Sequence, residues 1–108
     1  MEYKQKGLWM PSAYDGNLLR FKEDYVVGLK PVMSGNHAEH RIKLTSPSDV
    51  FLVIGIEVFD RHALFFVMID GEMVSIASPF NIFDARNKMS TKTDRLNSWL
   101  LTIAEEVG

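Results

Sequence analysis

Three consecutive apolar segments between residues 50 and 77 constrain the fold most strongly. Residues 50–59 are rich in β-branched and aromatic side chains, which predicts a strand, and residues 63–69 have the same character. Asp70-Gly71 then leads into the third segment, residues 72–77. An Asp-Gly pair between two such runs favours a type I′ turn, because both central residues of that turn need a positive φ. The segment therefore predicts a three-stranded antiparallel meander.

Both sides of the first two strands in this meander are apolar. A sheet with one wet face would alternate apolar and polar residues along each strand. Simple alternation instead places one apolar set on one face, namely Leu52, Ile54, Ile56 and Val58, and a second apolar set on the other, namely Phe51, Val53 and Phe59. Both faces therefore need cover. The sheet can curl, the N-terminal segment can fold over the second face, or a second subunit can pack there.

A helical period replaces the strand pattern near the C-terminus. Five apolar residues fall at i, i+3, i+4, i+7 and i+11: Leu96, Trp99, Leu100, Ile103 and Val107. Thr91 and Asp94 have the spacing of a capping box, and Gly108 follows the last apolar position. The pattern predicts an amphipathic helix from about residue 91, packed on one face of the sheet.

Shorter patterns predict further strands before the meander. Asp15-Gly16 is placed to turn a strand at residues 8–10 into one at residues 18–21. Residues 25–29 favour another strand, which we expect Lys30-Pro31 to end because proline cannot donate to a ladder. Residues 41–44 alternate polar and apolar, as a half-exposed strand does.

Together these elements predict an α+β protein. We expect a mostly antiparallel sheet of five to seven strands, open or curled, with a C-terminal amphipathic helix on one face. A length of 108 residues predicts a single domain, covering residues 1–108.

Charge and cysteine content exclude several classes of function. The chain has 12 basic and 14 acidic residues, so it lacks the clustered positive charge that general nucleic-acid or membrane binding needs. It has no cysteine, which excludes disulfides, Cys-ligated zinc and cysteine nucleophiles. The N-terminus has no apolar run typical of a secretory signal. We expect a cytoplasmic protein without a cofactor, and not a nucleic-acid binder.

Two histidines, His37 and His40, are the candidate metal ligands. On a helix they would share one face, with Glu39 beside them. However, Ser34-Gly35-Asn36 before them is typical of a loop, and a closed site needs about four ligands. No further ligands can be named, so the sequence predicts no metal site.

Three residues are candidates for binding a ligand. Glu57 is the one charged residue within the most apolar strand, where burial would raise its pKa unless Arg41 or Lys43 pairs with it. Trp9 and Tyr25 belong to an aromatic N-terminal third that is suited to lining a pocket or an interface.

No residue set with the spacing of a catalytic motif occurs in the chain, which favours binding over catalysis. The first hypothesis is a small non-enzymatic interaction protein, homodimeric through or beside an apolar sheet face. The alternative is a small enzyme or carrier, with a pocket that is enclosed by the curled sheet and contains Glu57.

Overall fold

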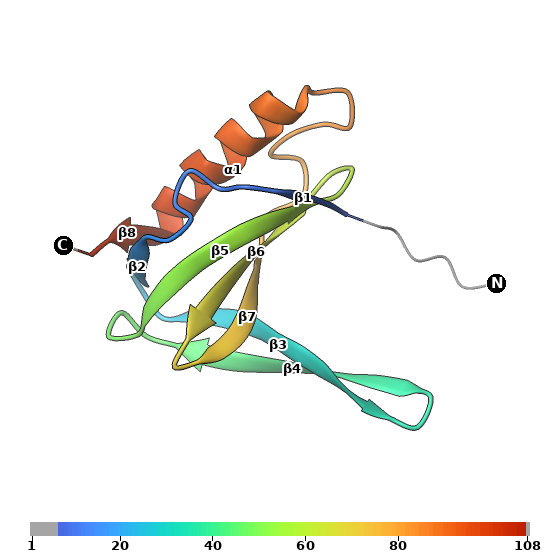
Figure 1. Cartoon of the computed structure of the whole chain (residues 1–108), viewed down its shortest axis with the longest axis vertical. Coiled ribbons are helices and arrows are strands. Elements are labelled where there is room, and N and C mark those ends of the chain that lie inside the picture. The colour runs from blue at the N-terminus through green and yellow to red at the C-terminus, as the bar shows by residue number, and fades with distance from the viewer. Residues whose placement is uncertain (1–6, 108) are drawn as a thin grey trace.

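The computed structural model describes residues 7–107, except for the side chains of residues 31 and 32, and shows an eight-stranded sheet followed by one helix (Figure 1). The strands are β1 (Leu8–Met10), β2 (Leu18–Phe21), β3 (Tyr25–Ser34), β4 (His37–Thr45), β5 (Val50–Val58), β6 (Ala63–Ile69), β7 (Glu72–Ala77) and β8 (Ala104–Glu106). The helix, α1, covers Met89–Ile103. This confirms the α+β class, but the predicted strand count was too low. Within the described residues, no helix has the length and apolar character needed to cross a membrane.

The strands follow the order β4-β3-β7-β6-β5-β2-β8, and β1 lies beside the other end of β5. All of their pairings are antiparallel. The predicted meander is confirmed as β5-β6-β7. Its Asp-Gly turn has the two positive φ angles of a type I′ turn, 51° at Asp70 and 76° at Gly71. Because β4 and β8 are the two ends of the order, the sheet is open and does not close into a barrel.

The two N-terminal strands do not form the predicted hairpin. Each pairs with β5 instead: β1 along Ile56–Val58 and β2 along Val50–Leu52. The turn between them also bonds to β5, because the Gly16 N–H donates to the Val53 carbonyl at 2.9 Å. Asp15-Gly16 is therefore a turn as predicted, but it lies along β5 and does not join two neighbouring strands.

Strands β3 and β4 are both longer than predicted. β3 does not end at Pro31; it continues to Ser34, with a register irregularity between Leu29 and Val32. An irregularity of this kind lets a proline remain in a strand, because the residue that cannot donate falls where regular pairing is interrupted. β4 begins at His37, where a loop was expected, and forms a long hairpin with β3.

The helix begins and ends earlier than predicted. Its N-cap is Lys88, which makes no side-chain cap bond, so Thr91 and Asp94 lie within the helix and form no capping box. It ends at Ile103, and the chain then becomes β8, which pairs with β2. Val107 is consequently 41% exposed and lies outside the helical stripe. The predicted cap at Gly108 lies outside the described residues.

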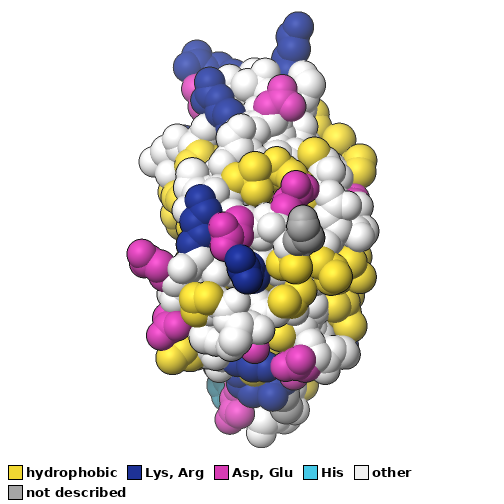
Figure 2. Space-filling view, turned by 90° about the vertical axis from the view of Figure 1, so that its left-hand side faces the viewer, with side chains coloured by type: hydrophobic (Ala, Val, Ile, Leu, Met, Phe, Trp, Pro, Cys, Tyr) yellow, Lys and Arg dark blue, Asp and Glu magenta, His cyan; other side chains and the backbone are white. Residues whose placement is uncertain are grey.

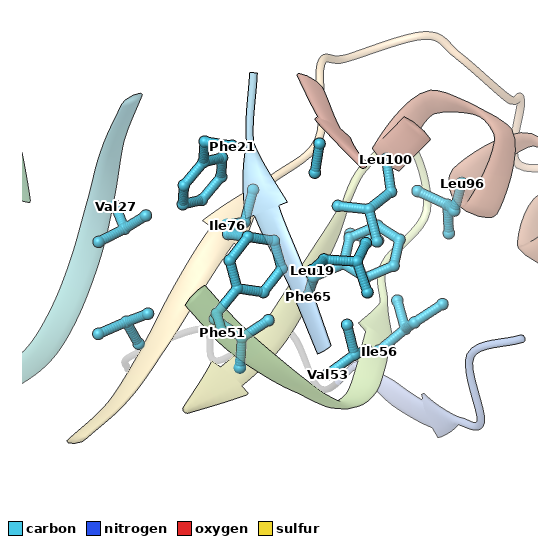
Figure 3. Close-up of a cluster of buried hydrophobic side chains, with 14 of the residues drawn as sticks. Leu19, Phe21, Val27, Phe51, Val53, Ile56, Phe65, Ile76, Leu96 and Leu100 are labelled. Carbon is cyan, nitrogen blue, oxygen red and sulfur yellow. The ribbon is translucent and has the colours of Figure 1, made fainter. Parts of the chain in front are cut away.

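The core lies between α1 and one face of the sheet, which we call the inner face (Figure 3). Leu96 and Leu100 of the helix are fully buried against Phe65 and Ile56, among others. The side chains labelled in Figure 3 come from β2, β3, β5, β6, β7 and α1, so one cluster joins both layers. The helix therefore covers one face of the sheet, as predicted, and does not cover the opposite face, which we call the outer face.

Candidate functional site: the outer face of the sheet

A bulge in the middle of β5 decides which residues lie on the outer face. Val53 pairs with Val67 and Gly55 with Phe66, so Ile54 is an extra residue in β5. Both Val53 and Ile56 are buried on the inner face although they are three residues apart. The expected set of Leu52, Ile54, Ile56 and Val58 on one face was therefore wrong: the bulge reverses the alternation within the strand.

Close packing against Trp9 explains why residue 55 is a glycine. A Cβ atom at this position would come within 2.9 Å of the Trp9 indole ring. That ring lies tilted against Phe66, with 5.1 Å between the ring centroids. Gly55 therefore lets β1 place Trp9 across β5 and onto β6.

The outer face is apolar over most of its width. Eight large apolar side chains from six strands are between 36% and 72% exposed on it: Trp9, Leu18, Val26, Ile42, Leu44, Val50, Leu52 and Met73. Leu64, Phe66 and Met68 of β6 are half-buried between them. Hydrophobic side chains also interrupt the charged surface along the right-hand side of Figure 2. Exposed apolar patches of this breadth mark interaction surfaces in soluble proteins.

A groove of about 920 Å³ crosses the outer face where β3 meets β7. These two strands pair only at Gly28 with Ser75 and at Leu29 with Val74, and the chain diverges on either side. A Cβ atom at Gly28 would lie 2.8 Å from the Ser75 hydroxyl, so glycine permits this close approach. The groove is lined mainly by apolar side chains, including Ile42, Leu64, Phe66 and Met73, with Lys30 and His40 among its polar groups.

The three predicted ligand-binding residues do not meet in one place. Trp9 and Glu57 are cross-strand partners between β1 and β5, so both side chains lie on the outer face. Tyr25 packs against the core, with its ring stacked on Phe21 at 5.0 Å, and so belongs to the inner face. None of the three lines the groove between β3 and β7.

Neither partner suggested for Glu57, Arg41 or Lys43, forms an ion pair with it among the described residues. Arg41 donates from Nη2 to the Lys30 carbonyl within the β3–β4 hairpin, at 3.0 Å. Glu57 itself lies half-buried beneath Gly7, where an added Cβ would overlap its side chain. Among the described residues the ion pairs are Arg20–Glu105 and Arg86–Asp84, so Glu57 lacks there the charged partner that an acid–base site would use.

The two candidate metal ligands lie on a strand. His37 and His40 are three residues apart in β4, and alternation along a strand sends such side chains to opposite faces. Among the described residues, no group of three or more His, Asp and Glu side chains is placed to hold a metal ion. The third histidine, His62, stacks on Phe59 at 4.7 Å at the β5–β6 turn.

The position of Tyr25 leads to a testable pH dependence. Burial raises the pKa of its phenol above the ordinary value of about 10, because the phenolate is disfavoured away from water. A group of this kind stabilises the fold below its ordinary pKa and loses that contribution as the pH rises through the folded value. In urea denaturation at increasing alkaline pH, we expect the wild type to lose stability more steeply above about pH 10 than Tyr25→Phe. Parallel losses in the two proteins would contradict this placement.

The residues of the groove are those that sequence reasoning missed. Alternation within residues 63–69 correctly separates Phe65 from Leu64 and Phe66, so these two residues of the groove wall could be predicted from the pattern. The rest of the wall depends on which strand lies beside β7, and that non-local pairing leaves no local signal. Comparison with known family models, with curated proteins and with solved structures finds no match to this chain.

Proposed function

We propose that this chain is a non-enzymatic interaction protein, and that it binds a second copy of itself through the outer face of its sheet and the adjoining edge strand β4. The observation that carries the proposal is the exposure of eight large apolar side chains on the outer face. Burial of apolar surface is worth roughly 25 cal/mol per Å², so leaving such a face in water forgoes substantial stabilisation.

The alternatives for covering this face are reduced by the fold. The sheet is open, so curling does not enclose the outer face. Within the described part of the N-terminal segment, β1 extends the sheet beside β5, and only the Trp9 ring reaches across β5 towards β6. These observations favour a partner molecule, and a second copy is the simplest partner because most soluble oligomers are homo-oligomers.

A carrier role is supported by one observation, the apolar groove between β3 and β7. Its volume of about 920 Å³ lies within the usual range for small-molecule sites. It is a groove on the surface, however, and Glu57 does not line it. The polar residues along the groove, which would orient a ligand, are Lys30, His40, Arg41, Glu72 and Ser75. We rank this second function below self-association because the apolar surface extends well beyond the groove.

The proposal predicts which methyl groups respond to protein concentration. In methyl NMR spectra recorded from millimolar to micromolar concentration, we expect the signals of Ile42, Leu44 and Met73 to shift on dilution. The methyl groups of Leu96 and Leu100 are buried between the helix and the inner face, so their signals should not shift. Dilution shifts restricted to inner-face methyls, or spectra that do not change with concentration, would contradict self-association through the outer face.

A further inference from the structure

The edge strand β4 has little support from the rest of the molecule. Within the part of the chain that the structure describes, it is the terminal strand of the sheet and pairs only with β3. Because β3 forms ladder pairs with β7 only at Gly28–Ser75 and Leu29–Val74, the distal part of the β3–β4 hairpin extends away from the body (Figure 1). Residues 37–42 of β4 are all exposed. A two-stranded ribbon of this kind is only marginally stable in water, and its free edge is a template for another strand.

We propose that β4 pairs antiparallel with β4 of a second copy. The two-fold axis passes between the two strands at His40, so that His40 of one copy lies opposite His40 of the other. This inference rests on the proposed self-association and specifies one contact within it, the one made by the edge strand. A two-fold axis perpendicular to the strands keeps outer faces on the same side, so only residues of the same face oppose one another. The register is then defined by the residue that faces its own copy across the axis.

Three such registers pair most of β4, and they differ in their charges. The register centred on His40 pairs residues 37–43 and places Glu39 opposite Arg41 of the second copy, twice per dimer. The register centred on Arg41 pairs residues 37–45 and also has two attractive pairs, Glu39 with Lys43, but it places the two Arg41 side chains against each other. The register centred on Ile42 pairs residues 39–45 and places Arg41 opposite Lys43. Like charges directly opposite destabilise a strand pair, so charge complementarity selects the His40 register.

The side chains that this register uses are available. The ion pairs in the described residues are Arg20–Glu105 and Arg86–Asp84, so neither Glu39 nor Arg41 has an ionic partner there. The bond from Arg41 to the Lys30 carbonyl holds the guanidinium against its own hairpin and leaves further donors for a carboxylate. On the outer face, the same register brings Ile42, which is 72% exposed, opposite Ala38 of the second copy. The two outer faces then become continuous across the dimer, so this pairing covers apolar side chains next to β4 and leaves those on β1 and β2, such as Trp9 and Leu18, for contacts of the outer face itself.

Charge reversal in sedimentation velocity tests the register. Glu39→Arg and Arg41→Glu each replace two attractive pairs with two repulsive ones, so each should raise the dimer dissociation constant about tenfold or more. The double variant restores opposite charges at the same places and should return to within about threefold of the wild type. Circular dichroism of each variant confirms that the fold is retained.

Lys43→Glu is the matched control, because it reverses a charge on the same face of the same strand. In the His40 register Lys43 faces His37, and the dissociation constant should change by less than about threefold. In the register centred on Arg41 it would meet Glu39 and weaken the dimer as strongly as the other variants. That result, or a double variant that stays dissociated, would overturn the inference.

The outcomes also separate this inference from the proposed function. A dimer that resists every charge variant of β4, but still shows dilution shifts at Leu44 and Met73, would refute pairing through β4 and leave outer-face association standing. A wild type that stays monomeric at all concentrations would refute both.

Discussion

Replacing Phe65 with alanine is expected to lower the free energy of unfolding by about 3–5 kcal/mol, the largest effect of any single change considered. Phe65 lies in the middle of the central strand β6, is 0% exposed, and has its ring 6.1 Å from that of Trp99 on the helix. Alanine would leave a cavity between the sheet and α1, because the rigid neighbours on both layers cannot close around it. Urea denaturation at equilibrium, with the protein dilute, measures the loss.

Phe66→Ala is the matched control for that measurement. Phe66 is the next residue in β6 and the same residue type, but it lies half-buried on the outer face against Trp9. Its removal creates an open surface depression and no closed cavity, so we expect less than half of the Phe65 effect. Equal losses at the two positions would contradict the assignment of one covered and one uncovered face.

Replacing Ile42 with lysine is expected to weaken self-association by about thirtyfold or more, equivalent to roughly 2 kcal/mol at an interface hot spot. Ile42 is the most exposed of the eight outer-face side chains, at 72%, and it belongs to both the groove and the edge strand β4. A lysine there removes apolar contact and brings a charge that must lose water on association. Because Ile42 packs little within one chain, unfolding of the dilute protein should change by only about 0.5 kcal/mol.

Phe80→Lys provides the comparison at an equally apolar and exposed site. Phe80 is 69% exposed in the loop after β7, where its ring lies 5.0 Å from that of His62 and away from β4. Sedimentation velocity of both variants should show weakened association for Ile42→Lys alone. If Phe80→Lys weakens association equally, general hydrophobicity and not the outer face is responsible.

Local sequence signals were sufficient for the meander and for the existence of the helix. The Asp70-Gly71 turn and the β-branched runs on either side act between neighbours in sequence, and the structure has them as predicted. The helical stripe at Leu96 and Leu100 likewise depends on spacing alone. Elements whose own residues determine their geometry could therefore be predicted.

Features that depend on distant partners could not be predicted in this way. The chain leaves the helix at Ile103 because β2 supplies a partner for β8, and no residue in 104–106 signals this by itself. The bulge at Ile54–Gly55 reverses the faces of β5, and its position is fixed by pairing with β6 and by Trp9 packing over Gly55. Gly55 marked a possible bulge, but it did not show which side chains would be turned.

The candidate site shows the same division. Apolar character on both sides of β5 and β6 was visible in the sequence, and it indicated correctly that one helix leaves a second apolar face. The location of the groove was not visible, because it arises where β3 and β7 form only two ladder pairs. Glu57, Trp9 and Tyr25 were chosen by residue type, which does not indicate that two of them share a face and the third lies opposite.

Sedimentation equilibrium of the unmodified chain over a wide concentration range tests self-association most directly. We expect a reversible transition from 12.3 kDa at low concentration to twice that mass at high concentration, with Ile42→Lys remaining at the lower mass. A wild type that keeps the mass of one chain up to millimolar concentration would contradict the account, since the apolar outer face would then be stable in water without a second copy.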